Sequence, residues 1–318
     1  MCVGSHRPPG PAERYRSYRA YLGSLFPWRV YKIPLDAGFS CPNRDGTVAS
    51  GGCTFCDNAS FSPFSSGPRK SISRQLEEGI RFYSGKRFGG ERFIAYFQSF
   101  TNTYAPVAHL EKLYKEALLD PRVVGLAIGT RPDCVGEEVL DLLVRYRDRT
   151  QLSLELGLQS IHDATLRAVN RGHTAEQFWD AVNRVSRRGI RLCVHVILGL
   201  PGEGREEFLL TVESLARCPI DGIKFTHFYV PAGAPIAARF RSGEIATLRF
   251  EQYVELICEA LERLPPRVVI ERLMGEISGP DILAPRWGKS KSEILGRINA
   301  RLQERESYQG ARYSQGRR

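Results

Sequence analysis

The sequence predicts an α/β protein whose main part is a partial (β/α)6 barrel of the TIM type, followed by a C-terminal α+β extension. Six short runs rich in β-branched and other apolar residues alternate with segments whose apolar residues recur at helical spacing. The runs are apolar along almost their whole length, which is typical of a parallel sheet covered by helices. Parallel strands joined in this way close into a barrel, with the chemistry at their C-terminal ends.

Each element follows from its local pattern. The segment VAHLEKLYKEALL (107–119) repeats apolar residues at helical spacing, whereas VVGLAIG (123–129) is a short apolar run typical of a strand. The expected strands of the barrel are 29–36, 92–98, 123–129, 152–159, 191–200 and 221–230, and the expected helices are 71–84, 107–119, 136–148, 175–189 and 206–217.

These patterns divide the chain of 318 residues into three parts. Residues 1–28 form a basic and aromatic N-terminal segment, residues 29–230 form the barrel core, and residues 231–318 form the extension with a basic tail. A chain of this length can bury a large hydrophobic core. The elements expected in the extension are a helix at 250–264, a strand at 267–273 and a final helix near 290–306.

The chain is basic, with 45 lysines and arginines against 35 aspartates and glutamates and a formal net charge of +10. Such an excess suits a polyanionic partner, of which nucleic acid is the commonest. Residues 14–32, RYRSYRAYLGSLFPWRVYK, interleave arginines with aromatic residues. Arginine can pair with phosphate while aromatic rings stack on unpaired bases. The alternative is an amphipathic helix that packs its tyrosine face on the body of the protein.

The composition also bears on the compartment. No run of about 18 apolar residues occurs, so we expect no membrane-spanning segment, and the N-terminal residues lack the apolar stretch of a signal peptide. We therefore expect a cytoplasmic protein, whose eight cysteines do not form a disulfide framework. Five of the eight are scattered and are interpreted as small buried hydrophobic residues; they are Cys2, Cys134, Cys193, Cys218 and Cys258.

The other three cysteines lie close together after the first expected strand. Cys53 and Cys56 form a C-x-x-C pair, and Cys41 lies upstream of it. A structural zinc site uses four ligands, and a candidate fourth ligand, Cys134, follows a different strand. A [4Fe–4S] cluster bound by only three thiolates would leave one iron open to an exogenous ligand. On the cysteines alone, both metal centres remain open.

Further segments give these cysteines a context. In order along the chain, AIGTRPD (127–133), LELGLQS (154–160), NRGHT (170–174) and VHVILGLPGE (194–203) resemble the radical domain of the catalytic subunit of the elongator complex, and some also resemble oxygen-independent coproporphyrinogen oxidases. The stretches PLDAGFSCPNRDG, GGCTFC and YFQSFTNTYAPV are similar to those of the YhcC/YtqA family of small radical S-adenosylmethionine (SAM) proteins. The resemblance covers nearly the whole chain.

The resemblance implies a barrel of the radical SAM type and a defined chemistry. The protein would cleave SAM reductively at a [4Fe–4S] cluster and generate a 5′-deoxyadenosyl radical that takes hydrogen from a substrate. Cys41, Cys53 and Cys56 would bind the cluster, while the protein orients the cofactors and excludes water. The residues that would bind SAM are Phe55, Gln98, Ser99, Gln159, Arg171, His195, Ile197 and Gly199.

Several of these residues have an implied role and a structural alternative. Gln159 and Arg171 match residues that hold the ribose and the methionine carboxylate, and a carboxylate fits the N–H fork of arginine. Gly199 would permit a close approach to adenine. Alternatively, Gln159 satisfies a buried backbone group and Arg171 pairs with an acid such as Glu155. For His195 the alternative is a hydrogen-bonded core histidine.

The resemblance points to tRNA as the partner, at the C5 side chain of the wobble uridine, and the net charge agrees with an RNA partner. A flavodoxin or ferredoxin would supply the electron. Two alternatives remain. One is a radical SAM enzyme with a small-molecule substrate, as in the porphyrinogen oxidases, and the other is a non-catalytic protein that binds zinc or nucleic acid. The sequence assigns no catalytic residue beyond those that bind the cofactors.

Overall fold

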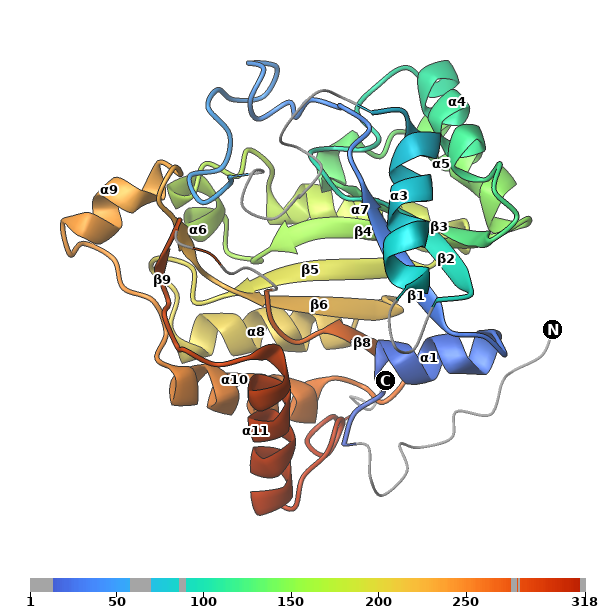
Figure 1. Cartoon of the computed structure of the whole chain (residues 1–318). Helices are drawn as coiled ribbons and strands as arrows, with labels where there is room; N and C mark the ends of the chain where they lie inside the picture. The colour runs from blue at the N-terminus through green and yellow to red at the C-terminus, as the bar shows by residue number, and fades with distance from the viewer. Residues whose placement is uncertain (1–13, 58–69, 86–89, 276–278, 280, 315–318) are drawn as a thin grey trace.

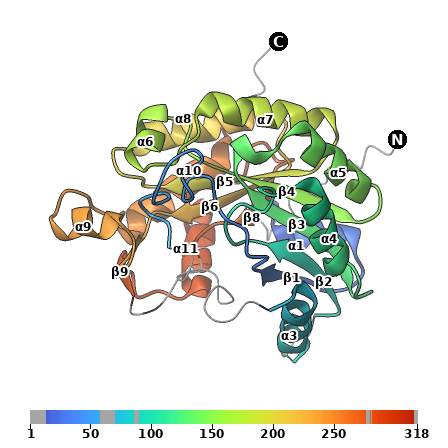
Figure 2. The same cartoon turned by 90° about the horizontal axis from the view of Figure 1, so that it is seen from above.

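The computed structural model describes residues 14–57, 70–85, 90–275, 279 and 281–314 (Figure 1). Its centre is a sheet of seven parallel strands in the order β1-β2-β3-β4-β5-β6-β8. The sheet curls into a half-barrel with helices on its outer side (Figure 2). The strands are β1 (Val30–Leu35), β2 (Arg92–Phe97), β3 (Val123–Thr130), β4 (Gln151–Gln159), β5 (Leu192–Leu198), β6 (Gly222–His227) and β8 (Val269–Arg272).

The predicted α/β partial barrel is confirmed. All six expected barrel strands form, and the strand expected at 267–273 is β8, which adds a seventh parallel strand beside β6. Among the residues that the structure describes, no helix is long and apolar enough to cross a membrane. The helices expected between the strands are α3 (Ile72–Ser84), α4 (Val107–Ala117), α5 (Glu137–Arg147), α7 (Ala175–Arg187) and α8 (Arg205–Ala216).

Helix starts follow signals in the sequence. The hydroxyl of Ser71 accepts a hydrogen bond from the N–H of Arg74 at the start of α3, and Thr174 forms a capping box with Gln177 at the start of α7.

The two C-terminal helices form as expected, whereas several other elements are too short to show a period. These C-terminal and short elements are α10 (Phe250–Arg263), α11 (Lys291–Glu304), α6 (Asp163–Ala168), α9 (Ile236–Arg241), a 3₁₀ turn at Pro132–Cys134, and the antiparallel pair β7 (Val230–Pro231) and β9 (Ile282–Ala284).

The main hydrophobic core lies between the sheet and the outer helices. Phe97 of β2 packs edge to face on Tyr114 of α4 with ring centroids 5.1 Å apart, and Phe225 of β6 meets Phe208 of α8 at 5.8 Å. All four side chains are buried. Aromatic and aliphatic packing of this kind joins the outer face of the sheet to the helices, and a smaller hydrophobic cluster lies on the inner face.

Helix α1 (Tyr18–Leu25) lies at the N-terminal ends of the strands, away from the loop that follows β1 (Figure 1). Leu22 of this helix packs on Ile94 and Tyr96 of β2. Just before the helix, Ser17 pairs with Ile270 of β8. The N-terminal segment therefore begins beside the last strand, β8, and α1 then leads into the first strand, β1. Helix α1 covers the N-terminal end of the barrel.

The sequence of segment 14–32 fits either an RNA-contacting segment or an amphipathic helix that packs on the rest of the protein. In the structure it packs on the rest of the protein. Tyr18 and Tyr21 lie against the inner face of the sheet. Arg14 donates from Nη1 to the carbonyl oxygen of Ser307 at 3.2 Å, and Arg16 donates from Nη1 to the carbonyl oxygen of residue 267 at 2.8 Å. These two arginines are therefore engaged within the chain.

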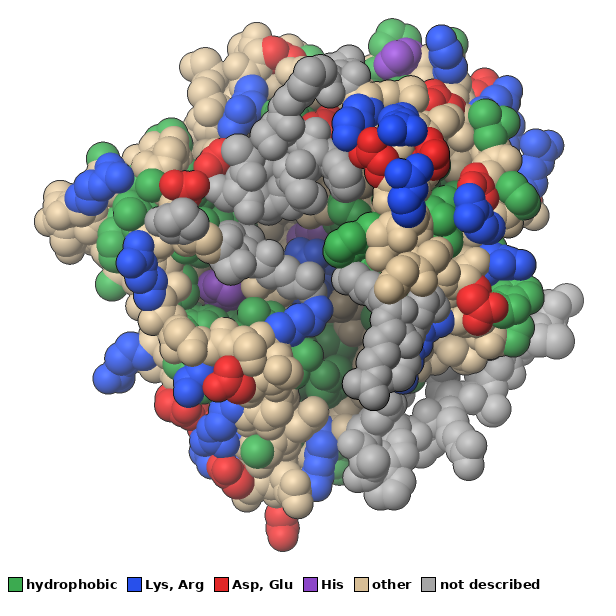
Figure 3. Space-filling view, viewed as in Figure 1, with side chains coloured by type: hydrophobic (Ala, Val, Ile, Leu, Met, Phe, Trp, Pro, Cys, Tyr) green, Lys and Arg blue, Asp and Glu red, His purple; other side chains and the backbone are tan. Residues whose placement is uncertain are grey.

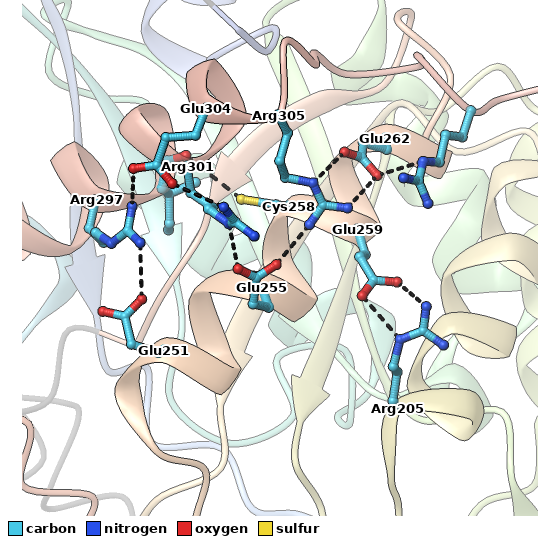
Figure 4. A network of polar contacts seen from close by, with 12 residues as sticks. Arg205, Glu251, Glu255, Cys258, Glu259, Glu262, Arg297, Arg301, Glu304 and Arg305 are labelled. Atoms are coloured by element: carbon cyan, nitrogen blue, oxygen red, sulfur yellow. Dashed lines mark hydrogen bonds and ion pairs between the residues drawn. The ribbon is translucent and has the colours of Figure 1, made fainter.

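Ion pairs join the C-terminal helices to each other and to the barrel (Figure 4). Glu255 of α10 accepts hydrogen bonds from Arg301 of α11 and from Arg305 just beyond it. Glu259, one turn further along α10, pairs with Arg205 at the start of α8. The pairs therefore run from α11 through α10 to the barrel helix α8.

Helix α3 approaches β1 so closely at Gly79 that a methyl group would clash. A Cβ there would lie 2.4 Å from Cγ2 of Ile33, which is fully buried. We expect Gly79→Ala to destabilise the fold by about 1–3 kcal/mol, because the enclosed neighbour cannot move aside, and to lower the midpoint of urea unfolding. In the control Gly296→Ala, no atom lies within 4 Å of the new Cβ, so alanine should raise the midpoint. Equal midpoints would contradict this account.

Candidate active site

A cavity of about 430 Å³ opens at the C-terminal ends of the strands, beside the loop that follows β1. Figure 3 shows a hollow near the middle of the face turned to the viewer, with Lys or Arg and His side chains inside it. The cavity lining brings together nine residues expected from the sequence, and these are Cys41, Cys53, Phe55, Cys56, Gln98, Gln159, Arg171, His195 and Ile197.

The cysteine loop, residues 41–56, is held by the chain that follows α6. The N–H of Thr54 donates to the carbonyl oxygen of Val169 at 3.0 Å. Asn170 donates from Nδ2 to the carbonyl oxygen of Gly52 at 2.8 Å. Strand β1 therefore fixes one end of the loop, and the α6 region fixes the end that carries the C-x-x-C pair.

The three thiols lie close enough to influence one another electrostatically. Burial, followed by the neighbouring thiols of Cys53 and Cys41, raises the pKa of Cys56 to about 11, against the opposing positive charges of Arg44 and Arg171. Cysteine binds metals as the thiolate. Ionised thiols in this place therefore need more positive charge than the two arginines provide, and a metal centre would supply it.

The thiols are not arranged as a single-ion site. In the described part of the chain, no three His, Cys, Asp or Glu side chains converge closely enough to hold one metal ion. Cys134, the candidate fourth ligand, lies in the 3₁₀ turn and lines a different cavity together with Asp133. Burial and then the Asp133 carboxylate raise the pKa of Cys134 to about 12. The thiols at the cavity beside the loop that follows β1 are therefore those of Cys41, Cys53 and Cys56.

Arg171 connects the cysteine loop to the cavity. Its Nη1 lies 3.6 Å from Sγ of Cys53, and its Nη2 donates to the carbonyl oxygen of Gly157 at 2.7 Å. Its Nε is buried and has no acceptor among the described residues. A buried guanidinium N–H without an acceptor is costly, so the site suits an anionic ligand such as a carboxylate. The alternative pairing of Arg171 with Glu155 is not among the ion pairs of the described residues.

Gln159 lies at the end of β4 with a φ of 73°, where the register between β4 and β5 shifts. A positive φ is uncommon for a residue other than glycine, and such strain concentrates at ligand sites. Ser99 and Gly199 are not among the described residues that line the cavity. Ser99 is fully buried. Gly199 has a φ of 82°, and a Cβ there would lie 2.9 Å from Leu248. The residue that Gly199 approaches closely is therefore Leu248.

Buried charges form the floor of the cavity. Glu155 of β4 has a fully buried side chain and accepts hydrogen bonds from Lys32 of β1 at 2.7 Å, from His195 of β5 at 2.7 Å, and from Lys224 of β6. Although burial opposes ionisation, Lys224 and Lys32 hold the pKa of Glu155 well below its usual range. Lys32 also pairs with Glu271 of β8 at 2.8 Å. Lys32 and Glu271 therefore link the two edge strands of the half-barrel.

His195 is neutral at physiological pH. Burial lowers its pKa to about 4, although its hydrogen bond with Glu155 opposes this. A neutral imidazole that donates from Nε2 to the Glu155 carboxylate keeps Nδ1 as an acceptor. The side chain is thus both a hydrogen-bonded partner of the buried network and part of the cavity lining.

Comparisons with known proteins agree with this geometry. Residues 45–215 match the model of the radical SAM superfamily, and residues 220–304 match the radical SAM C-terminal domain. YtqA of Bacillus subtilis is 38% identical over 298 residues, which cover 94% of this chain and 92% of that protein. YhcC of Escherichia coli K12 is 39% identical over 277 residues, covering 87% of this chain and 88% of that protein. The chain belongs to the radical SAM superfamily.

The radical SAM fold of the chain also appears among solved structures. The archaeal Elp3 of Methanocaldococcus infernus superimposes with a TM-score of 0.65 at 18% sequence identity, covering 88% of this chain and 64% of that one. Human elongator complex protein 3 is 29% identical over 164 residues, which are 50% of this chain and 29% of that protein. The present chain therefore corresponds to only part of the elongator proteins.

Membership in the radical SAM superfamily implies a [4Fe–4S] cluster and SAM, and the residues present fit both. Cys41, Cys53 and Cys56 would hold the cluster through three thiolates. The buried Nε of Arg171, which has no acceptor in the described part of the chain, would hold the SAM carboxylate. Gln159 lies beside it in the same cavity.

The sequence analysis overlooked several cavity residues of this radical SAM protein. Lys32, Glu155 and Lys224 form the buried network, and Arg272 lines the wall. Charged residues are almost never fully buried unless they are paired. A charge within an otherwise apolar predicted strand, as in LELGLQS or DGIKFTHFYV, is therefore the signal that would have found the network.

We expect Glu155→Gln to destabilise the protein by about 3–5 kcal/mol, because it leaves Lys224 buried without its carboxylate and Lys32 with Glu271 alone. The folded pKa of Glu155 is depressed, so its contribution is present above its unfolded pKa of about 4.3 and is lost as the pH falls through the folded pKa. Urea unfolding at neutral pH measures the effect. Glu78→Gln, which removes the surface ion pairs of Glu78 with Lys70 and Arg74, is the control and should change little. Equal midpoints for the two variants would count against the network.

We expect Arg171→Gln to bind SAM about tenfold to a hundredfold more weakly, since a charge-assisted hydrogen bond contributes about 1.5–3 kcal/mol. The measurement is SAM titration of reconstituted protein, with iron and sulfide determined on the same samples. Arg167→Gln, on an exposed position of α6 nearby, should bind SAM like the wild type. Unchanged SAM affinity in Arg171→Gln, at normal iron content, would remove Arg171 from the SAM site.

Proposed function

We propose that this protein is a radical SAM enzyme that acts on tRNA, at the C5 side chain of the wobble uridine. One observation carries the proposal. The cavity that gathers the three cysteines and six of the eight residues expected to bind SAM also contains four arginines, of which Arg131 is paired with Asp133, against a single carboxylate among its described lining residues. A cavity of this charge suits a substrate that belongs to a polyanion. The net charge of +10 and the elongator-like motifs support the same substrate.

When bound, the cluster and SAM together supply one-electron cleavage of SAM, which yields an organic radical able to take hydrogen from the substrate. The residues of the chain would bind and orient these cofactors and enclose the reacting atoms. Arg171 would fix the SAM carboxylate through a charge-assisted hydrogen bond, and His195 Nδ1 is placed to accept one from the nucleoside. Phe55 packs against an apolar cluster that includes Ile197, and this packing would keep water from the reacting atoms.

The RNA would approach the C-terminal face of the barrel, since the cavity opens there. The basic N-terminal segment is not the contact surface in this proposal, because Arg14 and Arg16 bind carbonyl oxygens near the opposite end. Arg44 of the cysteine loop is exposed at the cavity and is a candidate for a phosphate contact. A flavodoxin or ferredoxin would supply the electron.

The test compares tRNA nucleosides by mass spectrometry in a strain that lacks the gene. We expect the C5 side chain of the wobble uridine to be missing or altered, to be restored by the wild-type chain, and to remain altered with Cys53→Ala, which lacks one cluster ligand. A nucleoside profile identical to that of the parent strain, together with no tRNA binding at low salt, would reject tRNA. It would favour a small-molecule substrate instead.

A further inference from the structure

One wall of the cavity carries hydrogen-bond donors that have no partner among the residues that the structure describes. Thr226 of β6, Tyr229 just after β6, and Arg272 at the end of β8 all line the cavity. Neither hydroxyl group makes a hydrogen bond with the described residues, and the Arg272 guanidinium makes neither a hydrogen bond nor an ion pair with them. The three side chains are half-buried. They are therefore accessible from the cavity but only partly hydrated.

The strands place these donors together. Lys224 of β6 is in register with Arg272 of β8, and Thr226 lies one inward-facing position further along β6. Arg272 also acts electrostatically on the neighbours of this wall. Burial lowers the pKa of both His195 and Lys224, and the positive charge of Arg272 lowers each further. Arg171 lies against the cysteine loop, with its Nη1 3.6 Å from Sγ of Cys53, whereas Arg272 lies at the end of β8.

The charges along this part of the barrel do not balance. The described residues of the network and its wall comprise two carboxylates and four cations, which are Glu155 and Glu271 against Lys32, Lys224, Arg191 and Arg272. Three of the cations are paired with the two carboxylates, and the cation left over is Arg272. A partly buried cation without a counter-ion is unfavourable, and an anionic ligand would offset this cost.

We propose that Arg272, Thr226 and Tyr229 form a subsite for an anionic group of the substrate, either a carboxylate or a phosphate. Both groups accept two parallel hydrogen bonds from the guanidinium fork, and the two hydroxyl groups supply further donors. The subsite would hold the substrate by its anionic group within the cavity that holds SAM. This inference rests on the proposed function, since it names the chemistry of the substrate at the same site.

The test uses cluster-reconstituted protein saturated with SAM and without reductant, so that Arg171 is occupied and no turnover takes place. Inorganic phosphate and acetate are titrated separately by calorimetry. We expect the wild type to bind at least one of them, and Arg272→Gln to bind it about tenfold to a hundredfold more weakly. Arg272→Lys, which keeps the charge and loses the fork, should be intermediate. The exposed control Arg167→Gln should bind like the wild type, and the preferred anion distinguishes phosphate from carboxylate.

Equal affinity of the wild type and Arg272→Gln for both anions would overturn the subsite. A loss of SAM affinity in Arg272→Gln would also overturn it, because Arg272 would then belong to the SAM site. Retained SAM affinity together with weakened anion binding supports it, and also shows that the variant folds around an intact cavity.

Transfer RNA from the deletion strain separates this inference from the proposed function. If anion binding depends on Arg272 but the tRNA of the deletion strain matches that of the parent, the anionic subsite stands and the tRNA function fails. If the wild type and Arg272→Gln modify that tRNA with equal kcat/KM, the tRNA function stands and the subsite fails.

Discussion

Glu155 is ionised in the middle of the barrel, and much of the structure depends on the partners that make this possible. A buried carboxylate without partners would be strongly destabilising, and three strands contribute side chains that surround it, Lys32, His195 and Lys224. Lys32 is shared with Glu271, so the network reaches the two edge strands, β1 and β8, which are not neighbours in the sheet. The ion pair joins the first and last strands across the opening of the half-barrel.

The two ends of the barrel differ, since the N-terminal end is covered and the C-terminal end is open. At the N-terminal end, α1 covers the opening with Leu22 and its tyrosines, and the arginines before it bind carbonyl oxygens. At the C-terminal end the cavity remains open and lined with donors. Arg171 faces the cysteine loop with one buried N–H that lacks an acceptor in the described part of the chain, and Arg272 lies on the wall formed by β6 and β8. The chain thus offers two places for negative charge in one cavity, which suits a cofactor and a substrate held side by side.

Most of the fold was predictable because it depends on local periodicity. The expected strand at 152–159 and the expected helix at 175–189 agree with β4 and α7 to within two residues. Six of the eight residues that the motifs predict to bind SAM line the cavity, among them Gln159 and Arg171. Position in a motif does not determine which side of the backbone a side chain occupies, and so Ser99 and Gly199 lie outside the described cavity lining. The short helix α6, which supports the cysteine loop, has too few residues to produce a periodic signal.

By itself, the sequence determined the order of strands and helices, the three-cysteine loop and the family, since each depends on residues near one another in the chain. It did not determine which charges meet. Lys32 and Glu271 are 239 residues apart, and their pairing arises only when the curled sheet brings its first and last strands together. The same curvature leaves Arg272 without a counter-ion in the described chain and engages Arg14 and Arg16 elsewhere. Charge pairing in a low-dielectric interior depends on distance in space, and folding establishes that distance.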